Sequence, residues 1–192
     1  MQPMATSTLM TDVLKSSAVE LDDFDGVVRL HWPRVFRFAL ASLRDRDAAE
    51  TVTQDCFLKA YRGKDGFRGE SSVITWLLQI AVNLIRDHAR NRRLQFWKRN
   101  RTADFDFDGA SNEIVNRDES PESRTLAKQQ LEAIWRASEN LPERQRTVFL
   151  LRFVEDLDLL EIAAATGMKE GTVKIHLHRA LQTVRARMEN LR

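Results

Sequence analysis

Six polar side chains on one face of a predicted helix could bind a nucleic-acid strand. The helix starts near Ser72, and its polar face presents hydroxyl and amide groups first and guanidinium groups later. Hydroxyls and amides can read bases, whereas arginines bind phosphates. Asp87 is the only acid in this stretch, whereas a merely solvated face usually mixes acids and bases. The pattern favours nucleic-acid contact, and the six residues are Thr75, Gln79, Asn83, Arg86, Arg90 and Arg93.

A second candidate lies between Asp156 and Met188. Asp158 and Glu161 have the spacing of a capping box, which begins a helix, and Gly167 can adopt the positive φ of a tight turn. The pattern predicts a helix-turn-helix that places its second helix in the major groove of DNA; the alternative is a solvated amphipathic helix. The predicted inner stripe is Val173, Leu177, Ala180, Leu181, Val184 and Met188, and the outer face is Lys174, Ile175, His178, Arg179, Gln182 and Arg185.

The charges are segregated along the chain, although the formal net charge is only +2. The stretch Arg86–Arg101 has seven Lys or Arg and one acid, whereas Asp104–Glu122 has seven acids and one base. Six Lys or Arg and two acids follow from Lys169 to Arg192. Such separation lets a nearly neutral chain bind a polyanion.

Other classes of protein are disfavoured. Cys56 is the only cysteine, which excludes an internal disulfide and fits a reducing cytoplasm. The histidines and Cys56 have no metal-ligand spacing, and no nucleophile–base pair or phosphate-binding loop stands out. We therefore expect no enzyme activity, no metal and no cofactor. No apolar run reaches membrane-spanning length and residues 1–20 do not resemble a secretion signal, so we expect a cytoplasmic protein without direct membrane insertion.

The elements that must position these side chains are helices. Strand signals are nearly absent, and seven Gly and four Pro leave long stretches free for helices. The prediction is an all-α fold of two small helical domains, 21–97 and 121–192, joined by a flexible acidic linker, 98–120, after a loose tail, 1–20. In the first domain we expect helices at Asp22–His31, from Pro33, at Asp47–Arg62 and from Ser72.

Two blocks of this sequence closely resemble the extracytoplasmic-function (ECF) sigma factors, the promoter-specificity subunits of bacterial RNA polymerase. The blocks are RGESSVITWLLQIAVNLIRDHARNRR and LPERQRTVFLLRFVEDLDLLEIAAATGMKEGTVKIHLHRA, and HWPRVFRFAL and QDCFLKAY extend the first. The resemblance implies a non-enzymatic subunit that binds core RNA polymerase and directs promoter recognition, DNA melting and transcription initiation. Its implied partners are the β′ clamp helices and β flap of the polymerase, promoter DNA and an anti-sigma factor.

The resemblance also implies residue roles. In region 2 (21–97), the β′ clamp helices would dock on Glu50, Gln54, Asp55 and Phe57. Melting and recognition of the minus-ten element would use Arg68, Ser71 and Ser72 with the six polar residues from Thr75 to Arg93, because melting captures unstacked bases while cations follow the strand. In region 4 (121–192), the minus-thirty-five element would be read by Thr172, Lys174, Ile175, His176, His178 and Arg179.

Two residues depart from the family pattern. Thr51 stands where an acid is frequent, which weakens the docking assignment, and Ile175 stands where a small polar residue is frequent. An exposed isoleucine can pack against a thymine methyl group. The hypothesis is a shifted promoter preference that Ile175→Ser relaxes or changes.

The acidic linker has two interpretations besides a solvated tether. Asp104, Asp106, Asp108 and Gly109 begin like a calcium loop, but Val115 stands where the final Glu is required, so calcium binding is disfavoured. The resemblance implies instead that the linker passes through the polymerase cleft toward the RNA exit path. Neutralising its acids should then impair initiation more than promoter binding.

One alternative function remains at this point. The segment GTVKIHLHRAL also resembles the DNA-reading helix of LuxR-type regulators, which act as stand-alone transcriptional regulators. Those proteins usually carry a separate sensory or receiver domain, whereas the amino-terminal block here lacks alternating strands. This difference favours the sigma factor.

Overall fold

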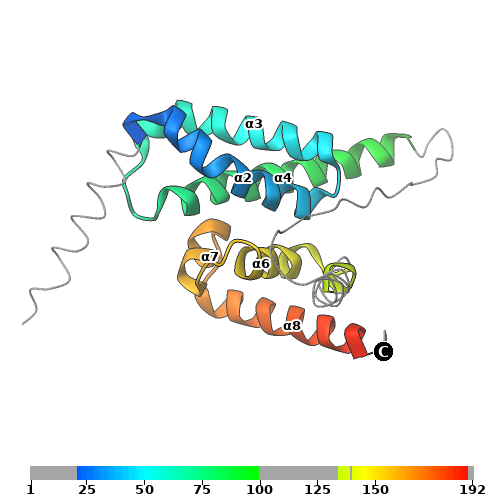
Figure 1. Ribbon diagram of the computed structural model, residues 1–192. Coiled ribbons are helices and arrows are strands. Elements are labelled where there is room, and N and C mark those ends of the chain that lie inside the picture. Colours follow the sequence, from blue (N-terminus) through cyan, green and yellow to red (C-terminus); the bar gives the residue numbers. More distant parts are fainter. Residues whose placement is uncertain (1–20, 100–133, 139, 190–192) are drawn as a thin grey trace, which may run out of the picture.

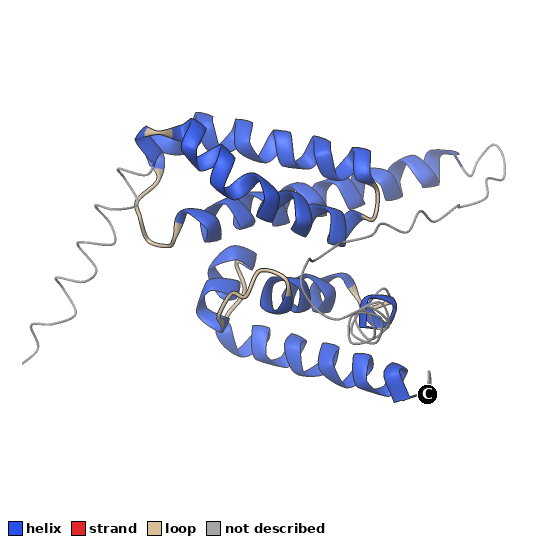
Figure 2. Ribbon diagram, viewed as in Figure 1, coloured by secondary structure: helices blue, strands red, loops and turns tan. Residues whose placement is uncertain are grey.

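The computed structural model describes residues 21–99, 134–138 and 140–189, with side chains from 92 to 99 left out. Within these ranges the secondary structure is helical and contains no strand (Figure 2), which confirms the all-α prediction. The helices form two blocks (Figure 1), as expected from the sequence. The tail 1–20 and the acidic stretch with its calcium-like pattern lie outside the described residues. No described helix is both long and apolar enough to cross a membrane.

The first block contains α2 (Phe24–Leu43), α3 (Arg46–Gly63), the short 3₁₀ helix η1 (Lys64–Gly66) and α4 (Val73–Arg99). Aspartate caps begin α2 and α3, where the amides of Gly26 and Ala48 donate to Asp23 and Asp45 at 2.9 and 3.0 Å. Such side chains satisfy backbone amides that have no partner inside the helix. The helices therefore begin where the sequence places polar caps.

The predicted break at Pro33 is wrong, because α2 continues through this residue. A proline inside a helix removes one backbone hydrogen bond and crowds the preceding turn. Here the buried side chains Val27 and His31 before the proline and Val35 and Phe38 after it lie on one continuous face. Packing of this face against the rest of the block outweighs the local loss.

The core of the first block joins all three long helices. Trp32 of α2 stacks on Phe57 of α3 with ring centroids 5.5 Å apart, and Val35 and Phe38 are fully buried. Cys56 donates from its thiol to the carbonyl of Leu77 at 3.3 Å. Val73, Leu77 and Ala81 are buried, and Ile80 and Leu84 pack against the core, which confirms the apolar stripe predicted for α4.

The second block contains α6 (Glu143–Phe153), α7 (Leu159–Thr166) and α8 (Glu170–Glu189). The capping box is present: the Glu161 amide donates to Asp158 Oδ1 at 2.8 Å, and the Asp158 amide donates to Glu161 Oε2 at 2.9 Å. Gly167 ends α7 with a φ of 68°. The predicted helix-turn-helix is therefore confirmed as α7 and α8, with Val173, Ala180 and Val184 of α8 in the core.

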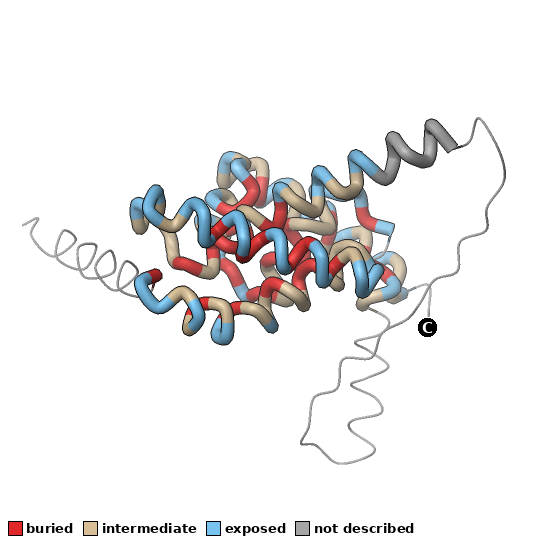
Figure 3. The backbone as a smooth tube through the Cα atoms, turned by 90° about the horizontal axis from the view of Figure 1, so that it is seen from above, coloured by how far each residue is buried: buried red, intermediate tan, exposed pale blue. Residues whose placement is uncertain are grey.

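The two blocks pack against each other, which the sequence analysis did not predict. Helix α4 lies against α7 and α2 lies against α6 (Figure 1). Leu78 and Val82 of α4 are 0% and 4% exposed, although they lie outside the predicted stripe. Leu78, Val82 and Ile85 form a second apolar stripe on α4. Buried residues lie mainly where the helices face one another (Figure 3).

Candidate nucleic-acid interface

Helix α8 presents an exposed face that carries most of the predicted groove-reading residues. Lys174, Ile175, His178 and Arg179 are all exposed, and Ile175 has 52% of its surface accessible. The ammonium of Lys174 pairs with Glu170 Oε1 at 2.6 Å, one turn earlier in the helix. This face therefore combines two cations, an imidazole and one uncovered aliphatic group, a set that can contact phosphates, base edges and a thymine methyl.

Thr172 and His176 are less accessible than those four residues. Both are only partly exposed, and Thr172 lies in the first turn, where its amide donates to the Lys169 carbonyl at 2.9 Å. The Nδ1 atom of His176 is buried and has no hydrogen-bond partner in the part of the chain that the structure describes. These two residues flank the exposed face of α8.

Helix α7 holds α8 in a fixed orientation. Ile162 and Ala165 of α7 are buried together with Val173 and Ala180 of α8. The intervening turn needs the left-handed conformation of Gly167, which most residues with a Cβ avoid. The exposed face of α8 is therefore mounted on a packed pair of helices, as groove readers require.

Helix α4 presents a second polar and basic face. Gln79, Asn83, Arg86 and Arg90 are exposed, so two amides lie beside two guanidinium groups. Arg90 pairs with Asp87 Oδ1 at 3.0 Å, with both side chains largely in solvent. The side chain of Arg93 lies outside the described residues. The exposed part of this face has groups suited to bases and to phosphates.

Thr75 does not belong to the accessible part of this face, because it is only 1% exposed. Its hydroxyl donates to Glu161 Oε1 of α7 at 3.4 Å and lies 2.8 Å from the Ser72 hydroxyl. Since Thr75 gives its single proton to Glu161, Ser72 donates to Thr75. In this arrangement Thr75 is covered, because the second block packs on the start of α4.

The loop before α4 supplies the remaining predicted minus-ten residues. Arg68 is highly exposed and lies 4.0 Å from the carboxylate of Glu70, which is equally exposed. Ser71 and Ser72 are partly buried, and the Ser72 hydroxyl accepts the Thr75 amide at 3.3 Å as a cap. Arg68 is therefore accessible to a ligand, whereas Ser72 is engaged in starting the helix.

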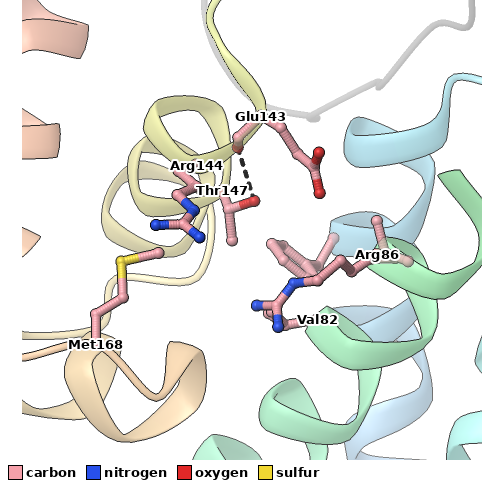
Figure 4. Close-up of a pocket in the computed structure, with 8 residues that line it drawn as sticks. Val82, Arg86, Glu143, Arg144, Thr147 and Met168 are labelled. Carbon is pink, nitrogen blue, oxygen red and sulfur yellow. Dashed lines mark hydrogen bonds between the residues drawn. The ribbon is translucent and has the colours of Figure 1, made fainter. Parts of the chain in front are cut away.

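A pocket between the blocks is lined by part of the α4 face. Arg86 enters it from α4, and Glu143, Arg144 and Thr147 of α6 line the other side (Figure 4). The apolar part of the pocket consists of Phe38 of α2, Val82 and Ile85 of α4, and Met168 after α7. One exposed arginine of the predicted minus-ten face thus borders the junction between the blocks.

Helix α3 carries the predicted docking residues on the side away from the core. Glu50, Gln54 and Asp55 are exposed, whereas Phe57 is 5% exposed and stacks on Trp32. Phe57 therefore packs in the core of the first block, unlike the three exposed residues predicted to dock with it. Leu58, which was not among the predicted residues, lies on the same side: it is 46% exposed and follows Gln54 by one helical turn.

Few other reactive groups occur in the described ranges. No group of three or more His, Cys, Asp or Glu side chains there could hold a metal ion. Burial raises the pKa of the Cys56 thiol to about 12, with a smaller opposing effect of the Ala81 backbone and of Lys59. Such a thiol stays protonated at neutral pH and is a poor nucleophile.

Comparison with known proteins matches both blocks to one family. The family model for Sigma-70 region 2 matches residues 27–95, and that for Sigma-70 region 4 matches residues 131–184. The ECF RNA polymerase sigma-E factor of Escherichia coli (strain K12) is 35% identical over 148 residues, which cover 73% of this chain and 73% of that protein. The RNA polymerase sigma-H factor of Pseudomonas aeruginosa is 33% identical and covers 84% of this chain and 83% of its own length.

A solved structure shares the fold. It is the sigma factor RpoE of Bartonella quintana in complex with the anti-sigma factor NepR, with a TM-score of 0.70 at 23% identity. The match covers 87% of this chain and 97% of that chain. The likeness therefore extends over both helical blocks.

Proposed function

This chain belongs to the ECF sigma factors, and from that premise we propose which of its residues dock on polymerase and which read the promoter. The chain is an RNA polymerase sigma factor that directs promoter recognition, and its family consists of sigma factors, which are not enzymes. We propose that 21–97 acts as region 2, 98–120 as the linker and 121–192 as region 4. The observation that carries the proposal is the pair of exposed polar and basic faces on α4 and α8.

Helix α8 reads the minus-thirty-five element in this proposal. Lys174 and Arg179 contact phosphates or guanine edges, His178 contacts a base edge and Ile175 packs on a thymine methyl group. Thr172 and His176 are less exposed, and in this proposal they lie close to the sugar-phosphate backbone of the DNA. The fixed mounting of α8 on α7 supports this assignment, because groove reading needs a rigid helix.

Helix α4 and the loop before it read and melt the minus-ten element. Gln79 and Asn83 offer amides to unstacked bases, and Arg68, Arg86 and Arg90 follow the phosphates of the strand. Thr75 can join them only where the second block no longer covers it. The exposure of the other residues supports their role, because a strand must reach them from solvent.

The polymerase partner docks on α3 in this proposal. The exposed surface of Glu50, Gln54, Asp55 and Leu58 combines two carboxylates with one aliphatic side chain. Such a surface is complementary to a partner that presents cations around an apolar patch, and we assign this partner to the β′ clamp helices. Region 4 contacts the β flap, and the protein works in the cytoplasm, where polymerase and promoters meet.

An anti-sigma factor is the second proposed protein partner. The solved structure with a similar fold is a complex of a sigma factor with its anti-sigma factor. A stand-alone regulator of LuxR type is not favoured, since residues 27–95 match region 2 of sigma factors. This match supports a role of the amino-terminal block as region 2 of a sigma factor and not as a sensory domain.

The direct test is transcription with purified components. The protein is added to core RNA polymerase and genomic DNA, and the transcript starts are mapped. We expect new starts that share sequence elements near minus ten and minus thirty-five. Specific binding to duplex DNA without any binding to core polymerase would support the stand-alone regulator instead.

A further inference from the structure

A buried carboxylate between α6 and α7 connects the two helical blocks. Glu155 is 2% exposed, and both of its oxygens accept from arginines of α2. Arg34 Nε donates to Oε2 at 3.0 Å, and Arg37 Nε donates to Oε1 at 3.1 Å. Each oxygen of the carboxylate is therefore held by a different guanidinium of the other block.

The same arginines also bind the backbone beside Glu155. Arg34 Nη2 donates to the Glu155 carbonyl at 2.7 Å, and Arg37 Nη2 donates to the Val154 carbonyl at 3.5 Å. In the opposite direction, Arg146 of α6 donates to the carbonyl of Ala41 in α2. The junction of α2 with α6 thus contains charge-assisted hydrogen bonds donated from both sides.

Glu155 depends on both arginines because it has no access to water. Its side chain is 0% exposed, whereas those of Arg34 and Arg37 are 35% and 40% exposed. Burial raises the pKa of the Glu155 carboxyl, although the two guanidinium groups oppose this shift. Removing the arginines would leave an uncompensated buried charge, which is strongly unfavourable in the closed arrangement and harmless once the blocks separate.

The closed arrangement covers part of one proposed promoter reader. Thr75 is buried against Glu161, and Arg86 borders the pocket between the blocks. The docking surface on α3 and Ile175 on α8 remain exposed. Polymerase and the minus-thirty-five element can therefore approach the closed protein, but the minus-ten strand cannot reach the whole α4 face.

Promoter geometry gives an independent reason for opening. Elements named for positions minus ten and minus thirty-five lie about 25 base pairs apart, or about 85 Å along B-DNA at 3.4 Å per step. A compact body of the size described here has a radius of gyration of about 14 Å and is about 36 Å across. Residues 100–133, which join the described ranges, can span at most about 110–120 Å. The chain can reach both elements only with its blocks apart.

We propose that Glu155, held by Arg34 and Arg37, is a latch that keeps the two blocks closed, and that releasing it is a step of promoter binding. The latch rests on the proposed function, because only a protein that reads both promoter elements needs to open. Glu155, Arg34 and Arg37 lie on none of the proposed docking or reading surfaces. The latch therefore acts only on the equilibrium between the closed and open arrangements of the blocks. A ligand that binds the open form must overcome this closed population, which lowers its apparent affinity.

The test measures block separation directly. Fluorophores are attached to Asp65→Cys on the first block and Ala186→Cys on the second, both of which replace exposed residues. Cys56 does not interfere, because it is fully buried. We expect high energy transfer in the latched protein and low transfer after addition of core polymerase and promoter DNA. In Arg34→Ala/Arg37→Ala, transfer should already be low without either ligand.

Transcription at limiting sigma factor provides the second measurement. The latch variant should need about tenfold less protein than the parent for half-maximal transcription, because it no longer populates the closed state. The matched control is Arg29→Ala/Arg62→Ala, which removes the same charge from exposed sites and should behave like the parent. If the double variant loses its helical circular dichroism, the single variants Arg34→Ala and Arg37→Ala replace it, because each removes one guanidinium from Glu155.

The outcomes separate the latch from the proposed function. A folded latch variant that keeps the parent's energy transfer, or that opens without any gain in transcription, overturns the latch and leaves the sigma function intact. If the parent, variant and control all fail to direct transcription with core polymerase, the proposed function is overturned. In that case the latch proposal is overturned as well, because it rests on promoter binding, even if energy transfer differs between the parent and the latch variant.

Discussion

We propose that Ile175, a single exposed side chain, contributes to promoter specificity. It is 52% exposed on a face otherwise made of Lys174, His178 and Arg179, and no packing requirement in α8 explains an aliphatic group there. The neighbouring cations bind any phosphate backbone, so they contribute affinity more than discrimination. In the proposed minus-thirty-five reader, the isoleucine is therefore the residue whose replacement should change the sequence preference.

We predict that Ile175→Ser changes which base is preferred at one minus-thirty-five position. Loss of the contact with a thymine methyl group should reduce discrimination there by about 1–3 kcal/mol. The measurement is transcription from a library of promoters randomised across the minus-thirty-five element, with Gln182→Ala as the control on the same helix. An unchanged sequence preference in the Ile175→Ser protein would rule out this contact.

Cys56 illustrates a residue whose chemistry is suppressed by its position. The thiol is fully buried, donates to the Leu77 carbonyl and has its pKa raised to about 12 by burial. The pKa of this thiol in the folded protein lies above its ordinary value of 9.0. Between pH 9 and about pH 12 the folded state keeps the proton that the unfolded state releases, so the free energy of unfolding falls as the pH rises through this interval.

We predict that alkylation of Cys56 by iodoacetamide at pH 8.5 is limited by opening of the protein. The rate should rise with denaturant and parallel the unfolding transition, because only the exposed thiolate reacts. A Glu50→Cys variant supplies an exposed thiol for comparison and should react rapidly without denaturant. Fast labelling of Cys56 in the native protein would contradict the burial of this thiol.

At the scale of elements, local sequence signals predict the caps and turns well. The capping box of Asp158 and Glu161 and the turn at Gly167 are each specified by residues within one helical turn. The break expected at Pro33 was wrong because burial of Val27, His31, Val35 and Phe38 depends on partners distant in the sequence. Tertiary packing overrides a local preference at that point.

We predict that Asp158→Ala lowers the free energy of unfolding by about 1 kcal/mol, with a range of 0.5–2. The change removes the acceptor of the Glu161 amide and exposes the start of α7 to fraying. Chemical denaturation followed by circular dichroism measures it, and Asp65→Ala at an exposed site serves as control. A loss no greater than that of the control would mean that the cap does not stabilise α7.

Helix α4 provides a prediction that separates phosphate contacts from base contacts. Replacing Arg86 and Arg90 by Ala should weaken binding of the holoenzyme to single-stranded minus-ten DNA, nearly independently of sequence. The slope of the logarithm of affinity against the logarithm of salt should fall by about 0.7 per arginine. Asn83→Ala should leave this slope unchanged and reduce sequence preference. Equal salt slopes in the arginine variant and the parent would show that neither arginine contacts phosphate.

At the scale of the whole molecule, the closed arrangement was the least predictable feature. The two helical blocks and the exposed residues of α8 follow from periodicity and charge, because each signal is local. Thr75 is buried only because α4 packs on α7, and Glu155 is bound only because α2 packs on α6. These contacts join residues far apart in the sequence, so no local pattern predicts them. The second apolar stripe of α4, with Leu78 and Val82, was the one available sign that this helix has a further partner.

The central claim is that α4 and α8 read two separated elements of one promoter. Its most direct test is cross-linking from photoreactive residues placed at Asn83 and at His178 in the complex with core polymerase and promoter DNA. The account predicts cross-links near minus ten from position 83 and near minus thirty-five from position 178, about 25 base pairs apart. Cross-links from both positions to one site, or the same pattern without polymerase, would contradict it.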